Sequence, residues 1–207
     1  MSERDTKTRI LDAAERLFAS DGFQATSLRD ITAGAGVNLA AVNYHFQSKD
    51  SLIDAVIARR VEPLNAGRMA LLEAAGPNPT LEQIIEAFVA PVFRIEIEEL
   101  APLLGRVLSN PDMFVDRVFN KHLASVSQRF RAELARALPE LPATELLWRL
   151  HFSVGVMTHT MLWGQIFPKI TGGVCTIDDR EALLRRAVQF LAAGFRAPAS
   201  NELQRHA

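Results

Sequence analysis

The chain has 207 residues, with 23 lysines and arginines against 24 acidic residues, and its net charge is -1. Such a balance argues against a basic protein that coats nucleic acid through charge alone. A single cysteine, Cys175, excludes an internal disulfide framework. The N-terminus lacks an apolar signal segment, and no apolar run is long enough to span a bilayer. We therefore expect a cytoplasmic protein without membrane contact.

Helical periodicity runs along almost the whole chain, and the alternation typical of strands is absent. A first helix is expected over residues 5–20, where Ile10, Ala14 and Phe18 share one face. The sequence thus predicts an all-α fold.

Residues 26–50 have the pattern of two short helices joined by a glycine turn. Ser27 and Asp30 have the spacing of a capping box, and Gly36 is suited to the left-handed end of that helix. Asn38 can cap the second helix, and Ser48 can cap a third. A helix of about seven residues is unstable alone. Held on a scaffold after a turn, it is what a helix-turn-helix protein inserts into the DNA major groove.

A family resemblance is carried by residues in the first quarter of the chain: Ile10, Leu11, Asp12, Ala13, Ala14, Leu17, Phe18, Gly22, Phe23, Thr26, Arg29, Asp30, Ile31, Ala35, Gly36, Val37, Tyr44, His45, Phe46, Ser48 and Lys49. In order and spacing they resemble the N-terminal DNA-binding region of TetR-type transcriptional regulators. Residues 37–46 also resemble a fatty-acid-responsive branch of that family. The resemblance implies operator DNA as a partner and a small effector that controls binding.

The resemblance also implies which residues contact DNA: Thr26, Ser27, Arg29, Asn38, Leu39, Ala40, Ala41, Asn43, Tyr44, His45 and Lys49. Asn43 can pair with an adenine edge, whereas Tyr44 and Lys49 suit phosphates. The family often has lysine or threonine where this chain has Leu39 and Ala41. More of the sequence recognition is therefore expected from apolar contact and DNA shape.

Further helices are expected over 49–75, from Thr80 onward with a kink or break at Pro91, over 111–138, 144–167 and 178–195. The strongest break is residues 76–79, Gly-Pro-Asn-Pro, followed by a capping box of Thr80 and Gln83. These boundaries predict a helix-turn-helix domain over 1–48, an effector-binding and dimerisation domain over 49–196, and a polar tail over 197–207.

The helices at 144–167 and 178–195 are apolar around much of their circumference, which predicts burial on more than one side. We expect them to form a four-helix homodimer interface, with Ser153 and Gly155 allowing close approach. Burial inside one protomer is the alternative. The middle of the chain is rich in aromatic residues and methionine, which favours a pocket for an apolar effector such as a fatty acid or acyl-coenzyme A. Its candidate lining is Phe88, Val92, Arg106, Met113, Phe114, Phe119, His122, Trp148 and Phe152.

Other functions find less support in the sequence. No nucleophile with a base, phosphate loop or Cys/His cluster is present, so we expect no catalytic residues, cofactor or metal. The most reasonable alternative is a helical adaptor of the same fold that binds a protein partner; an enzyme on a helical scaffold is a weaker one. The sequence leaves the effector, the operator and the sign of regulation open.

Overall fold

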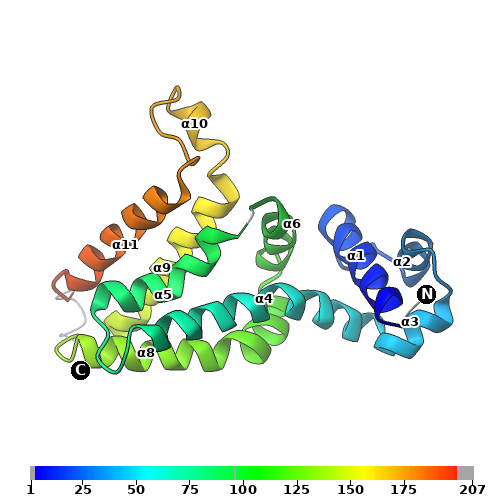
Figure 1. Ribbon diagram of the computed structural model, residues 1–207, viewed down its shortest axis with the longest axis horizontal. Helices are drawn as coiled ribbons and strands as arrows, with labels where there is room; N and C mark the ends of the chain where they lie inside the picture. The colour runs from blue at the N-terminus through cyan, green and yellow to red at the C-terminus, as the bar shows by residue number, and fades with distance from the viewer. Residues whose placement is uncertain (1–2, 96, 200–207) are drawn as a thin grey trace. The chain divides into compact units, whose positions relative to one another are not determined.

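The computed structural model describes residues 3–95 and 97–199, and every regular element in these ranges is a helix (Figure 1). The all-α prediction is confirmed. The elements are α1 (Glu3–Asp21), α2 (Leu28–Ala35), α3 (Leu39–Phe46), α4 (Lys49–Ala74), α5 (Leu81–Arg94), α6 (Ile97–Leu108), α7 (Pro111–Met113), the π-helix η1 (Phe114–Leu123), α8 (Ala124–Ala137), α9 (Ala143–Trp163), α10 (Phe167–Ile170) and α11 (Arg180–Arg196). None of the described helices is both long and apolar enough to cross a membrane.

The chain forms two compact units. The N-terminal unit comprises Met1–Pro63 and Glu98–His122, and the C-terminal unit comprises Leu64–Ile97 and Leu123–Ala207. They meet in sequence inside α4, at Pro63, whose ring nitrogen cannot donate a helical hydrogen bond. The predicted division after residue 48 is a functional one and stays a prediction. Of the predicted tail, residues 200–207 lie outside the described residues.

The core of the N-terminal unit is a three-helix bundle in which α1, α2 and α3 all contact one another. Ile10 and Phe18 of α1 are fully buried, as is Ile31 of α2. The ring of Phe18 lies 5.2 Å from that of Phe23, in the loop before α2. Burial of these side chains is what holds helices as short as α2 and α3 in place.

In the C-terminal unit, α5 is the central helix and contacts α8, α9 and α11. Its first turn is closed by the predicted capping box, because the Gln83 N–H donates to the Thr80 hydroxyl and the Thr80 N–H donates to the Gln83 side chain. Phe130 of α8 is fully buried and its ring lies 5.2 Å from that of Phe88. The helix continues through Pro91 to Arg94, so the proline lies in its last turn and does not divide it.

Two features of the middle of the chain differ from the predictions. A separate helix, α6, follows an extended residue, Ile95, where the sequence offers neither glycine nor proline as a break. The predicted helix over 111–138 begins at the Asn110 cap as expected, but ten of its residues form the π-helix η1. In a π-helix each N–H donates five residues back, and such turns are frequent at functional sites.

Arg149 joins α9 to the end of α11. Its guanidinium is 8% exposed and donates to the backbone oxygens of Phe195 (2.7 Å), Ala197 (2.8 Å) and Pro198 (3.1 Å). Nε and Nη2 donate to the carboxylate of Glu145, one helical turn earlier, at 3.2 and 3.0 Å. The Phe195 carbonyl lies in the last turn of α11 and the other two follow it, where a helix leaves acceptors without internal partners. The side chain therefore closes a helix end and neutralises a half-buried acid.

We predict that Arg149→Met lowers the free energy of unfolding by about 3 kcal/mol or more, because removing one partner of a buried ion pair strands the other. Urea unfolding followed by circular dichroism measures the loss. The matched control is Arg131→Met, at an exposed position on α8, which should change stability by less than about 0.5 kcal/mol. Equal midpoints for the two variants would show that Arg149 is not a structural clamp.

Candidate nucleic-acid interface

The segment from Ser27 to Asn38 has the predicted helix-turn-helix geometry. The Asp30 N–H donates to the Ser27 hydroxyl (3.2 Å) and the Ser27 N–H donates to the Asp30 carboxylate (2.9 Å), which begins α2. Hydrogen bonds from Ser27 hold the pKa of Asp30 below its ordinary value. Gly36 ends α2 in the left-handed conformation, with φ of 62°, and the Asn38 side chain accepts from the Ala41 N–H (2.9 Å) to begin α3. All three predicted caps are confirmed.

A long-range contact fixes the turn from the other side. Arg9 of α1 donates to the carbonyl oxygens of Ala35 and Gly36, at 2.5 and 3.1 Å. Its Nη2 would lie only 2.8 Å from a β-carbon at position 36, so the glycine is needed both for its φ and for the approach of the arginine. The turn is thus tied to α1, and α3 has a defined direction.

The outer face of α3 carries most of the predicted base-contacting residues. Leu39 and Tyr44 are 46% and 72% exposed, and Ala40 and Asn43 are exposed beside them. Val42 and Phe46 are buried on the opposite face, while Ala41 and His45 lie half-buried at its borders. An exposed face with one amide, one phenol and several apolar groups on a well-anchored short helix is what major-groove recognition requires.

The other residues predicted to contact DNA differ in their exposure and in their hydrogen-bond partners. Arg29 is exposed on α2. Ser27 and Asn38 are exposed but use their side-chain oxygens as helix caps. Thr26 is only 2% exposed, and its hydroxyl lies 2.8 Å from the Gly22 carbonyl oxygen and 3.2 Å from that of Leu17, so its predicted contact with DNA has little support. The donor is satisfied inside the protein and joins the end of α1 to α2.

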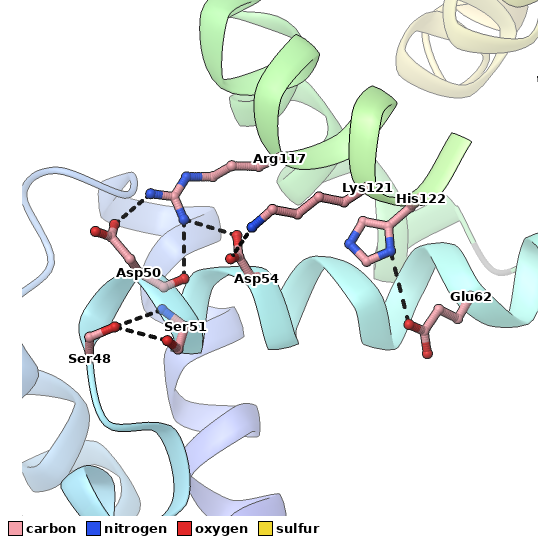
Figure 2. Close-up of polar contacts among 8 residues, drawn as sticks. All are labelled: Ser48, Asp50, Ser51, Asp54, Glu62, Arg117, Lys121 and His122. Carbon is pink, nitrogen blue, oxygen red and sulfur yellow. Dashed lines mark hydrogen bonds and ion pairs between the residues drawn. The ribbon is translucent and has the colours of Figure 1, made fainter. Parts of the chain in front are cut away.

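The connection between α3 and α4 consists of two residues. Gln47 has a φ of 64°, which is uncommon for a residue with a side chain, and Ser48 accepts from the Ser51 N–H (3.0 Å) to begin α4. Figure 2 shows this cap. Lys49 is half-buried and its ammonium donates to the Gln24 carbonyl at 3.3 Å. The sequence did not reveal the strained Gln47, since glutamine carries no turn signal.

An ion-pair cluster fixes the first turns of α4 against η1, as Figure 2 shows. Arg117 contacts the carboxylates of Asp50 (2.6 Å) and Asp54 (2.9 Å), and Lys121 contacts Asp54 at 2.6 Å. Burial alone would raise the pKa of Asp54, but hydrogen bonds and charge from Lys121 and Arg117 outweigh it and hold the pKa below its ordinary value. These residues were not predicted to act together, because 63 or more positions separate them along the chain.

The predicted effector residues of the N-terminal unit do not form a single site. Arg106, a predicted lining residue, donates through Nε and Nη2 to the carbonyls of Ala19 and Ser20 and closes the end of α1. Met113 and Phe114 are half-buried, and Phe119 is 38% exposed. His122 approaches Glu62, with 3.9 Å between Nδ1 and the carboxylate (Figure 2).

Those of the C-terminal unit also separate. Val92 is buried and Phe88 half-buried in the core around α5. Trp148 and Phe152 stack on each other along α9, with 5.9 Å between their rings, and are 55% and 59% exposed. Both side chains lie on the surface of the protomer, and their predicted contact with an effector stays a prediction. A groove of about 470 Å³ between α5 and α11 is lined by none of the predicted residues.

Comparison with known families matches both parts of the chain. The model for bacterial regulatory proteins of the tetR family matches residues 10–56. The model described as Tetracyclin repressor-like, C-terminal domain, matches residues 86–194, more than half of the chain. The second match includes residues 98–122, which pack in the N-terminal unit.

Two curated relatives share the N-terminal part. The chain is 33% identical over 90 residues to the probable HTH-type transcriptional regulator YttP of Bacillus subtilis (strain 168), covering 44% of this chain and 42% of that protein. It is 35% identical over 81 residues to the HTH-type transcriptional repressor KstR2 of Rhodococcus jostii (strain RHA1), covering 38% and 39%. The chain thus spans about two fifths of the length of these relatives.

Solved structures extend the likeness to the whole fold. The fatty acid degradation regulator FadR from Bacillus halodurans aligns with a TM-score of 0.63 at 16% identity, over 93% of this chain and 97% of that one. The TetR-family regulator PfmR from Thermus thermophilus aligns with a TM-score of 0.59 at 21% identity, over 91% and 100%. At these identities the likeness concerns the fold. With both family models matched, the chain belongs to the TetR family of DNA-binding transcriptional regulators, which are not enzymes.

Proposed function

We propose that this protein is an effector-responsive repressor that binds a near-palindromic operator as a homodimer. The observation that carries the proposal is the exposed face of α3, with Asn43 at its centre, on a helix whose ends and direction are fixed by side-chain contacts. Two such helices have to lie about 34 Å apart to enter successive major grooves. Repression is favoured because KstR2 is named a repressor. Since bacterial operators lie in the cytoplasm, the proposal places the protein there.

The dimer is proposed to form through residues 144–167 and 178–195. Support comes from large apolar side chains that the protomer leaves exposed on these two segments: Leu147, Trp148, Phe152, Leu162, Trp163, Ile166, Phe167 and Phe190. So many large apolar side chains left exposed on two segments are typical of an interaction site. Gly155 is exposed beside them, whereas Ser153 is 2% exposed and donates to the Arg149 carbonyl at 2.8 Å, so only the glycine is suited to a partner helix.

The effector is proposed to act by changing the separation of the two α3 helices. Residues 98–122 belong in sequence to the region that matches the C-terminal domain model, yet Arg117 and Lys121 attach this segment to the first turns of α4. A displacement of η1 would therefore move α4, and α3 is joined to α4 by only two residues. An effector can drive this change only if it binds the two arrangements with different affinity.

An apolar effector, with acyl chains as the leading candidates, is proposed from the aromatic middle helices and the resemblance of residues 37–46 to fatty-acid-responsive members. FadR, a fold relative, is named a fatty acid degradation regulator. The alternative of a protein-binding adaptor would require that no DNA sequence is bound specifically. Footprinting on the DNA upstream of the protein's own gene distinguishes the two.

For DNA recognition, we predict that Asn43→Ala weakens operator binding by about 1–3 kcal/mol and leaves binding to random DNA unchanged, because a base-reading amide is lost.

Lys49→Ala should weaken binding to operator and to random DNA, and it should lower the slope of log affinity against log salt by about one, as expected for one phosphate contact. Fluorescence anisotropy at several salt concentrations measures both. If Asn43→Ala loses equal affinity for operator and random DNA, Asn43 does not read a base. If Lys49→Ala leaves the salt slope unchanged, Lys49 does not contact a phosphate.

For the dimer, we predict that Gly155→Leu weakens association by about 1–3 kcal/mol through overpacking at the interface. Apart from the chain neighbours and the backbone of its own helix, no atom of the described residues lies within 4 Å of a β-carbon at this position, so folding of the protomer should be unchanged. Ala135→Leu, at an exposed position on α8, is the control. Sedimentation at concentrations near the wild-type dissociation constant measures the effect, and an intact Gly155→Leu dimer would mean that this surface is not the contact.

For the effector, we predict that affinity rises with acyl chain length, by about 0.8 kcal/mol for each methylene buried, until the pocket is full. Release of operator DNA should follow the same order. The measurement is an anisotropy competition with a series of free acids and coenzyme A thioesters. If neither series changes DNA affinity while a polar or planar aromatic compound does, the acyl hypothesis is wrong and ligand control itself survives.

A further inference from the structure

Among the described residues of the C-terminal unit, two arginines are buried, and their surroundings differ sharply. Arg149 is 8% exposed and makes five hydrogen bonds, two of them to Glu145, so its charge and all its donors are satisfied. Arg68, on the second half of α4, is 7% exposed. A buried guanidinium normally has an acid beside it, because burying an uncompensated charge is costly.

Arg68 has only neutral partners among the described residues. Its Nε donates to the Phe88 carbonyl oxygen at 2.9 Å, and its Nη1 donates to the Asn65 amide oxygen at 3.1 Å. The guanidinium carbon lies 4.9 Å from the centre of the Phe88 ring. In the part of the chain that the structure describes, no carboxylate lies within 4.0 Å of it. Burial lowers the pKa of Arg68 to about 10, so the group remains charged at neutral pH.

The donors that remain define what Arg68 can still bind. A guanidinium has five N–H groups, and the two hydrogen bonds use the one on Nε and one on Nη1. The N–H groups left over lie on the two terminal nitrogens, the edge that carboxylates and phosphates bind with two parallel hydrogen bonds. The surroundings on the ring side are apolar, since Phe88 packs on the buried Phe130.

We propose that Arg68 is the anchor for an anionic group of the effector, a carboxylate or a phosphate, whose apolar part packs near Phe88. This inference rests on the proposed control by an effector and assigns the side chain that would hold the negative group of an acyl effector. It also replaces the arginine selected from sequence, because Arg106 is committed to the end of α1. Free fatty acids and acyl-coenzyme A thioesters share this chemistry.

The alternative is that Arg68 only holds α4 against α5 through the Phe88 carbonyl. The two roles predict opposite effects of Arg68→Met on the protein without ligand. If Arg68 binds an anionic effector, the ligand-free protein contains an uncompensated buried charge. Arg68→Met removes that charge, so the thermal midpoint stays the same or rises. If the role is structural, loss of two hydrogen bonds lowers the midpoint.

The test uses the full chain, the variant Arg68→Met and the control Arg131→Met, an exposed arginine on α8. Dodecanoate, 1-dodecanol and dodecanoyl-coenzyme A are the probes, and thermal shift and calorimetry are the readouts. We expect wild type and Arg131→Met to bind at least one anionic probe about ten- to hundredfold more tightly than the alcohol. We expect Arg68→Met to lose that preference without a lower ligand-free midpoint.

The inference is overturned if the alcohol binds wild type as well as the anions do, if Arg68→Met keeps the preference, if its ligand-free midpoint falls, or if no probe binds. Preference for the acid or for the thioester separates a carboxylate from a phosphate source. Operator binding by ligand-free wild type is measured alongside. Its absence would refute the proposed regulator while leaving the anion result at Arg68 intact, so the two failures are distinguishable.

Discussion

A helix ends with carbonyl groups that no residue of the same helix can satisfy, and in this protein arginines from other helices supply the missing donors. Arg9 does this for α2, Arg106 for α1 and Arg149 for α11. Arg180 donates in the same way to Ile95, just beyond α5. Each contact satisfies polar groups and also fixes where one helix stops relative to another. The helix-turn-helix depends on two of these contacts, since the ends of α1 and α2 determine where α3 begins.

Local features of this architecture follow from the sequence, and long-range ones do not. Ser27, Asn38 and Thr80 act as caps as predicted, because the capping side chain and the backbone N–H that donates to it lie only three residues apart. The partners of Arg106 lie 86 and 87 positions away, and the pattern around it is that of any surface arginine. The internal hydrogen bonds of Thr26 were not evident for a related reason: a hydroxyl can bind a phosphate or a carbonyl equally well, and the sequence does not show which of them lies nearby.

The effector region was harder to predict than the DNA interface. Aromatic side chains at helical spacing indicate burial or an interface without distinguishing them, and Trp148 and Phe152 proved to be exposed while Val92 is core. The π-helix η1 was also beyond reach, because its hydrogen bonds differ from those of an α-helix by one residue and the sequence of that stretch has ordinary helical composition. Buried charge gives a clearer indication of chemistry than apolar lining does, and Arg68 becomes visible only when its surroundings are known.

Two residues, Gln47 and Ser48, connect α3 to α4, which is too short a connection for the two helices to move independently. The positive φ at Gln47 reverses the chain in one step, and the cap at Ser48 starts the next helix immediately. One inserted residue would turn every later side chain of α4 by about 100° around its axis if the helix started in place. Substitutions can therefore alter the outer face of α3 and with it the DNA sequence that is read, whereas this junction can change in sequence only at constant length. Single substitutions on α3 can therefore change DNA specificity without moving the helix, because the connection between α3 and α4 keeps a constant length.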